Sequence, residues 1–150
     1  RAYFFLSVDD AKYIDRAESE FTKAEAQGKR SSLTQMYLAT IQALRADNEF
    51  WPIRAKKMID EALEKIESVY EVSPQDFEIR FLRASTWFNL PAFFGKHDAS
   101  KAELQKLGKS FDKDTVSYPD FVRAVWADFL VDRKITSDPD QWQELRNLIR

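Results

Sequence analysis

Apolar residues recur at steps of three and four along most of the chain, which is the period of an amphipathic α-helix. The pattern is clearest between Pro52 and Val72, where charged residues such as Lys56 and Glu64 fill the opposite face. The apolar positions of this segment are Ile53, Met58, Ile59, Ala62, Leu63, Ile66, Val69 and Tyr70. Pro52 suits the first helical turn because its missing N–H would have no partner there. We therefore predict an amphipathic surface helix over this segment.

Start and stop signals predict six further helices. They cover about residues 9–27, 32–46, 74–89, 98–110, 119–132 and a last segment from 139. A side-chain oxygen just before an apolar run marks a helix start. The expected start residues are Ser32, Ser73, Ser117 and Asp138. Gly28 is expected to end the first of these helices.

The spacing of the predicted starts is regular, because each lies about 20 to 24 residues after the last. Short connections make consecutive helices pack antiparallel. The helices starting near 32, 74 and 119 are apolar almost all round, whereas those near 52, 98 and 139 are more charged. A buried inner row and an exposed outer row are typical of stacked helical hairpins. We predict one all-α domain over 1–150 with about seven helices, in which an N-terminal helix within 1–30 precedes three hairpins over 31–150.

This alternation resembles a tetratricopeptide-repeat array, in which small residues let paired helices approach and a proline follows the second helix. The matching positions are Ala84 and Ala127 in the first helices, Ala62 and Ala102 in the second helices, and Pro74 as the closing proline. The period here is near 44 residues, against about 34 in the family, so the likeness is to a degenerate form. Segments 78–83 and 90–96 are similar to a segment of poorly characterised bacterial proteins of this type. The resemblance implies a short right-handed solenoid.

Composition narrows the classes of function. The chain has 23 Lys and Arg against 25 Asp and Glu, a net charge of −2, which argues against a nucleic-acid partner. It has no cysteine, so a disulfide framework and a thiolate metal site are excluded. The longest apolar run near the start, 2–6, is too short to span a membrane. Because the chain begins with Arg1, removal of a secretory signal and truncation are both open, and so are an exported and a cytoplasmic location.

One histidine limits the catalytic hypotheses. His97 precedes Asp98, and such a pair can belong to a metal-assisted hydrolase that uses nearby carboxylates. Metal-dependent hydrolases of that kind need several more histidines, which this chain lacks. We therefore expect His97 to lie in a loop beside a helix start. We expect no catalytic residue, no bound metal and no cofactor.

Arginines on apolar helices are the strongest candidates for binding. Arg80, Arg83 and Arg123 lie on the helices predicted to be inner, where an unpaired buried charge would be unfavourable. They either pair internally with acids or line a concave groove, which the resemblance places along the first helix of each pair. Basic residues in such a groove can bind carboxylates of a peptide. The predicted groove residues are Tyr37, Arg80, Arg83, Trp87, Arg123 and Trp126.

The resulting hypothesis is a protein-interaction or scaffold module whose groove binds a protein or peptide partner. Two alternatives stay open. The first is the hydrolase that uses His97. The second is a self-associating structural protein, in which the aromatic pairs Phe50–Trp51 and Phe93–Phe94 meet a second copy as a homodimer.

Overall fold

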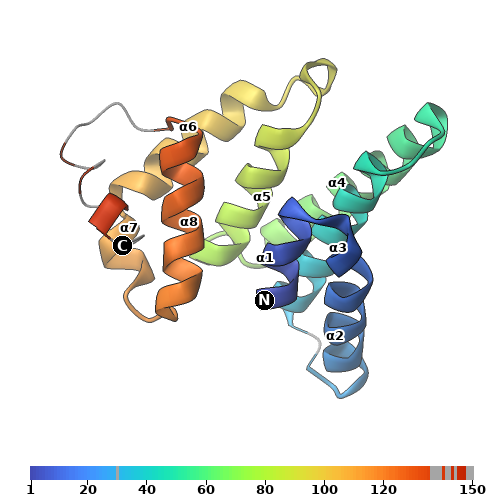
Figure 1. The fold of residues 1–150 in the computed structure, drawn as a ribbon, viewed down its shortest axis with the longest axis horizontal. Coiled ribbons are helices and arrows are strands. Elements are labelled where there is room, and N and C mark those ends of the chain that lie inside the picture. Colours follow the sequence, from blue (N-terminus) through green and yellow to red (C-terminus); the bar gives the residue numbers. More distant parts are fainter. Residues whose placement is uncertain (30, 136–139, 141–142, 144, 148–150) are drawn as a thin grey trace. The chain divides into compact units, whose positions relative to one another are not determined.

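The computed structural model describes residues 1–29, 31–135, 140, 143 and 145–147, and all secondary structure in this part is helical (Figure 1). The α-helices are α1 (Ala2–Asp9), α2 (Ile14–Ala26), α3 (Ser32–Asp47), α4 (Pro52–Val72), α5 (Phe77–Asn89), α6 (His97–Lys109), α7 (Phe111–Thr115) and α8 (Asp120–Asp132). Two 3₁₀ helices are η1 (Ala11–Tyr13) and η2 (Ala92–Phe94). None of the helices in the described part is long and apolar enough to cross a membrane. The all-α prediction is confirmed.

The N-terminal region contains two α-helices where one was predicted. Asp10 has an extended backbone (φ −143°, ψ 107°), and its side chain accepts a hydrogen bond from the Lys12 N–H. This local turn interrupts the helical hydrogen bonds, so α1 precedes η1 and α2. The predicted end of α2 is confirmed: Gly28 has φ +77°, and the Lys29 N–H donates to the Ala24 carbonyl at 3.0 Å. This is the Schellman arrangement, which favours glycine at the left-handed position.

A second difference raises the number of helices. Ser110 (φ −104°, ψ 8°) ends α6, and α7 begins at the buried Phe111. Residues 140, 143 and 145–147 are also α-helical, so the described part contains nine α-helices rather than about seven. The predicted start at Asp138 lies outside the described residues.

Three predicted start residues, Ser32, Ser73 and Ser117, do not cap their helices. Pro119 stands at the N-cap of α8 and no side chain caps that helix. The Ser31 side chain, rather than that of Ser32, accepts the Thr34 N–H at 3.1 Å. Asp76, rather than Ser73, accepts the Ile79 N–H at 3.0 Å. In both cases the side-chain oxygen belongs to the residue three positions before the one whose N–H it accepts, which is the spacing of an N-cap.

The chain divides into two compact units, residues 1–86 and 87–150, which we describe separately. In the first unit α3 packs against α2 and α4, and α1 packs against α2. Seven of the sixteen residues of α3 are buried, against three of the twenty-one residues of α4. The first unit therefore contains an antiparallel hairpin with an inner and an outer helix. Its arrangement into a solenoid, and the single domain over 1–150, remain predictions.

Tyr37 lies at the centre of the first unit. Its ring contacts Phe4 edge-on, with centroids 4.8 Å apart, and stacks on Phe21 at 4.4 Å. Its side chain is fully buried, so its hydroxyl needs a partner inside the protein. That partner is the carboxylate of Glu78 on α5, to which the hydroxyl donates a hydrogen bond.

Glu78 is itself completely buried, which is unusual for a carboxylate. Besides the Tyr37 hydroxyl it accepts a hydrogen bond from the Arg1 guanidinium, whose nitrogen lies 2.6 Å from Glu78 Oε2. Burial raises the pKa of Glu78, and the bonds from Tyr37 and Arg1 oppose this rise. Burial and the Glu78 carboxylate together raise the pKa of Tyr37. One carboxylate thus connects the start of the chain to α3 and α5.

The second unit is built around α6, α7 and α8. Its buried apolar side chains include Leu104, Leu107, Phe111, Val122, Trp126 and Leu130. Gln105 on α6 donates a hydrogen bond to the Ile135 carbonyl at 3.1 Å, which ties α6 to the residues after α8. Thr115 at the end of α7 accepts a hydrogen bond from the Arg123 guanidinium of α8 at 3.2 Å.

Replacing Tyr37 by Phe removes one donor from the buried carboxylate and leaves the ring packing intact. We expect the Tyr37→Phe variant to lose about 1 to 3 kcal/mol of unfolding free energy, because a buried charged acceptor loses its partner. Urea denaturation measures the loss. Tyr3→Phe is the matched control, because Tyr3 is exposed and the same change should cost less than about 0.5 kcal/mol. Equal losses in the two variants would contradict the role of the Tyr37–Glu78 bond.

The raised pKa of Glu78 predicts a pH dependence with a defined sign. The folded protein takes up the Glu78 proton more readily than the unfolded chain, whose Glu pKa is near 4.5. This residue therefore contributes stability below that pH and loses it as the pH rises through the raised value. We expect the unfolding free energy of the wild type, minus that of Glu78→Gln, to decrease as the pH rises from about 4.5. Denaturation of both proteins across a pH series measures this difference; an increase would mean that Arg1 and Tyr37 outweigh burial.

Candidate functional site

The six residues predicted to line a groove do not form one site within either unit. Tyr37, Arg80 and Arg83 belong to the first unit, whereas Trp87, Arg123 and Trp126 belong to the second.

The three aromatic candidates are core residues. Tyr37 and Trp126 are completely buried and Trp87 is 7% exposed, so none of them lines an open surface in its unit. The Trp126 ring contacts Tyr118 edge-on at 5.0 Å. The Lys96 ammonium lies 4.7 Å from the centre of the Trp87 ring. Their aromatic side chains therefore pack in the core of each unit rather than on a surface that a partner could contact.

Arg83 is paired within the first unit, which is one of the two alternatives left open by the sequence. Its Nε lies 3.0 Å and 3.1 Å from the two carboxylate oxygens of Glu67, and one terminal nitrogen lies 2.8 Å from Oε2. The guanidinium also lies over the Tyr70 ring, 4.1 Å from its centre. This bidentate, stacked arrangement uses the planar geometry of arginine. Arg80, three residues earlier, is half-buried.

Arg123 is paired within the second unit. Its terminal nitrogens lie 3.5 Å from Asp112 and 3.9 Å from Asp120, and its Nε donates to Thr115. The acids that pair with Arg83 and Arg123 here are Glu67 of α4, Asp112 of α7 and Asp120 in the first turn of α8.

His97 begins α6 rather than lying in the loop before it, and its side chain is exposed. Its ring contacts the Phe88 ring, with centroids 4.5 Å apart. Within the described part of the chain, no group of three or more His, Cys, Asp or Glu side chains is arranged to bind a metal ion.

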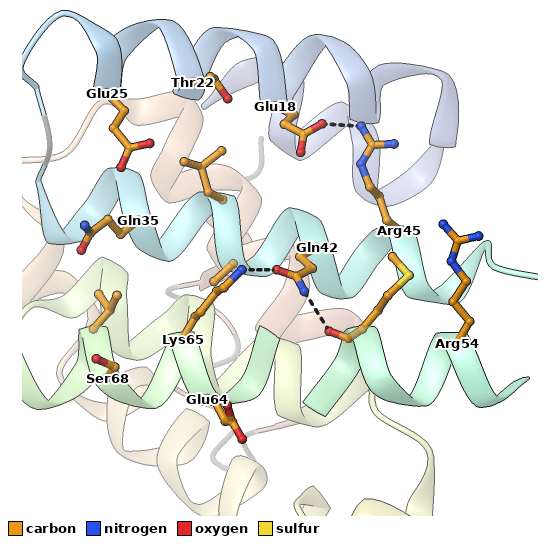
Figure 2. A pocket seen from close by; sticks show the side chains of 14 residues that line it. Glu18, Thr22, Glu25, Gln35, Gln42, Arg45, Arg54, Glu64, Lys65 and Ser68 are labelled. Atoms are coloured by element: carbon orange, nitrogen blue, oxygen red, sulfur yellow. Dashed lines mark hydrogen bonds and ion pairs between the residues drawn. The ribbon is translucent and has the colours of Figure 1, made fainter. Parts of the chain in front are cut away.

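A groove lies along α3 in the first unit, between α2 and α4 (Figure 2). Its volume is about 880 Å³. Leu38, Ala39, Met58 and Val69 give it an apolar base, while the side chains that face one another across it are polar or charged. The polar lining residues are Glu18, Thr22, Glu25, Gln35, Gln42, Arg45, Arg54, Glu64, Lys65 and Ser68.

Gln42 bridges the two helices that form one side of the groove. Its amide nitrogen donates to the Met58 carbonyl at 3.3 Å and to Glu61 at 3.2 Å, and its carbonyl oxygen accepts from Lys65 at 2.7 Å. All four hydrogen-bonding groups of this α3–α4 bridge lie at the groove or its edge. The bridge therefore fixes the separation of α3 and α4 at the middle of the groove.

Arg45 connects α3 to α2 on the other side of the groove. Its guanidinium lies 2.7 Å from Asp15 and 2.5 Å from Glu18, at the beginning of α2. Burial opposes the charge of Arg45, but these two carboxylates leave its pKa raised. Arg54 lies nearby and pairs with Glu49, so the arginines at this end of the groove have carboxylate partners, and Glu25 stands at the opposite end (Figure 2).

The sequence analysis missed this groove although a signal for it is present. Gln35, Leu38, Gln42 and Arg45 follow one another at steps of three and four, so they form a stripe along one face of α3. Polar residues on a stripe of an otherwise apolar helix indicate a face that is open to solvent.

A double-mutant cycle tests the assignment of Arg83 to internal pairing. Arg83 is 15% exposed and Glu67 37% exposed, so the pair is partly shielded from water. We expect the unfolding free energies of Arg83→Ala, Glu67→Ala and the double variant to show a coupling energy of about 1 kcal/mol. Fully exposed ion pairs have smaller coupling energies, and bidentate arginine–carboxylate pairs have larger ones. Strictly additive losses in the double variant would contradict the pairing.

Comparisons of this chain with protein-family models, with curated proteins and with solved structures returned no match.

Proposed function

We propose that the chain is a protein-interaction module that binds an extended peptide in the groove between α2, α3 and α4. The observation that carries this proposal is the groove itself, an open channel of about 880 Å³ with an apolar base and polar sides. Binding sites for small ligands and peptides commonly combine an apolar surface with a few polar groups that orient the ligand. This groove lies in the described part of the chain and uses side chains of three helices.

The groove carries charges of both signs along its length. Arg45, Arg54 and Glu18 stand at one end and Glu25 at the other, with Lys65 and Glu64 between them. The polar groups of an extended peptide can form hydrogen bonds with these side chains. The apolar side chains of such a peptide would contact Leu38 and Met58.

We further propose that the helical hairpins stack as a short tetratricopeptide-like solenoid. The support is the α3–α4 hairpin, in which the inner helix is largely buried and the outer helix largely exposed. In this arrangement the interaction surface is the concave face of the inner helices. On this proposal, the groove along α3 is part of that face.

Filling the groove tests the proposal. Ser68 is exposed and lines the α4 side of the groove, so the Ser68→Trp variant should fold and obstruct it. We would select ligands for the wild type from a displayed library of short unstructured peptides and measure their affinities by fluorescence anisotropy. We expect Ser68→Trp to weaken binding of the selected peptides by about tenfold or more, because a bulky side chain displaces the ligand from the apolar base.

Ser117→Trp is the matched control, because it places the same side chain at an exposed position of the second unit. It should bind the selected peptides as the wild type does. If no peptide is enriched, or if the enriched peptides bind Ser68→Trp as tightly as the wild type, the proposal is wrong.

A further inference from the structure

The turn between α3 and α4 carries a cluster of exposed apolar side chains. Ile53 is 88% exposed, Phe50 83% and Trp51 65%, and the first two values are the highest among large apolar side chains in the described residues. The Phe50 and Trp51 rings contact each other edge-on at 5.5 Å. We call these three residues the hairpin tip. A contiguous apolar cluster of this exposure commonly marks an interaction surface.

The hairpin tip extends beyond its neighbours in the first unit. Asp15 and Glu18, at the beginning of α2, reach Arg45. Residues 48–53 therefore come after the ion pairs between α2 and α3 along the chain. In Figure 1 the turn lies at the outer end of the α3–α4 hairpin, in turquoise.

The turn is ordered by its own polar contacts. The Glu49 carboxylate accepts a hydrogen bond from the Trp51 N–H at 3.4 Å and lies 3.2 Å from the Arg54 guanidinium. Pro52 occupies the first helical position of α4, and the Trp51 carbonyl accepts the Ala55 N–H at 2.9 Å. The exposed side chains are thus presented from a defined backbone.

Three cationic side chains follow the hairpin tip at the start of α4, and Glu49, Asp60 and Glu61 flank them in the sequence. Residues 50–59 contain Arg54, Lys56 and Lys57 and no acidic residue, although the whole chain has a net charge of −2. All three cationic side chains are more than half exposed. Arg54 pairs with the mostly buried Glu49, and the two lysines pair with Asp60 and Glu61 on the surface, where such pairs are weak.

We propose that the hairpin tip docks the protein onto an anionic lipid surface, with Phe50, Trp51 and Ile53 inserted at the level of the headgroups. Tryptophan and phenylalanine favour this boundary because one part of it is apolar and the other wet. Adjacent lysines and arginines add attraction to anionic headgroups. A planar, deformable surface accepts exposed apolar side chains at the end of a hairpin without a complementary pocket. This role is additional to the proposed peptide groove.

A second copy of the chain fits the tip less well. In a symmetric dimer formed tip to tip, each residue near the twofold axis faces its own counterpart or that of a neighbour. Arg54, Lys56 and Lys57 of the two copies would then approach one another, and like charges at close range repel. The charge pattern that favours an anionic membrane therefore disfavours such a dimer.

Vesicle cosedimentation of the whole chain tests the proposal. The probes are phosphatidylcholine vesicles with about 30% phosphatidylserine, and phosphatidylcholine vesicles alone. We expect binding to the anionic vesicles, and a fall in partitioning of about tenfold or more for Phe50→Ser/Trp51→Ser, because membrane affinity scales with inserted apolar area. Lys56→Glu/Lys57→Glu should also lose about tenfold or more on anionic vesicles, because each basic side chain adds attraction. Brominated lipids should quench the fluorescence of Trp51, and Trp51→Phe should remove that quenching.

Phe93→Ser is the matched control, since Phe93 is an exposed phenylalanine of the second unit. It should bind the vesicles as the wild type does, and circular dichroism should show that all variants remain folded. The proposal is overturned if the wild type does not bind anionic vesicles, or if Phe93→Ser loses as much binding as the tip variants. It is also overturned if solution molar mass shows a lipid-free dimer that the tip variants abolish, because the tip would then bind a second copy. Loss of vesicle binding in Ser68→Trp, with the tip intact, would equally contradict a separate site.

Discussion

A single buried carboxylate organises the first unit. Glu78 is removed from water, so its two oxygens must be satisfied inside the protein, and Tyr37 and Arg1 provide the donors. These residues come from α3, α5 and the residue before α1. Apolar packing alone tolerates small rotations of neighbouring helices, whereas a carboxylate with two directed donors does not. The geometry of α3, and hence of the groove along it, depends on this network.

The two sides of α3 carry different kinds of residue. Tyr37 and Ile41 face the core, and Gln35 and Gln42 face the groove. The Gln42 bridge to α4 and the Arg45 bridge to α2 are polar, so they set the spacing of the walls without closing the channel. A binding surface supported in this way remains open in the absence of ligand, because no apolar side chain needs to collapse into it.

The helices were largely predictable because their signals are local. Periodicity defined α3 and α4, and Pro52 and Gly28 marked a start and an end at the positions observed. The break at Asp10 was missed because it depends on one side-chain hydrogen bond that competes with an apolar run. The partners of Tyr37 and Arg83 were not predictable, since Glu78 and Glu67 lie 41 and 16 residues away on other helices. Arg123 contacts Thr115, which is 8 residues away on α7, and Asp120, which is three residues away on its own helix. Which acid meets which arginine is decided by tertiary packing rather than by sequence spacing.

The role of Glu49 in the α3–α4 turn has a thermodynamic consequence. An exposed loop normally loses conformational entropy when it meets a surface, and that loss subtracts from the affinity. Here the backbone around Trp51 is already restricted, because Glu49 accepts its N–H and contacts Arg54. Most of the ordering has taken place during folding. Contact with any surface would then leave only the side-chain rotamers to be fixed, so a contact of three side chains can have a measurable affinity.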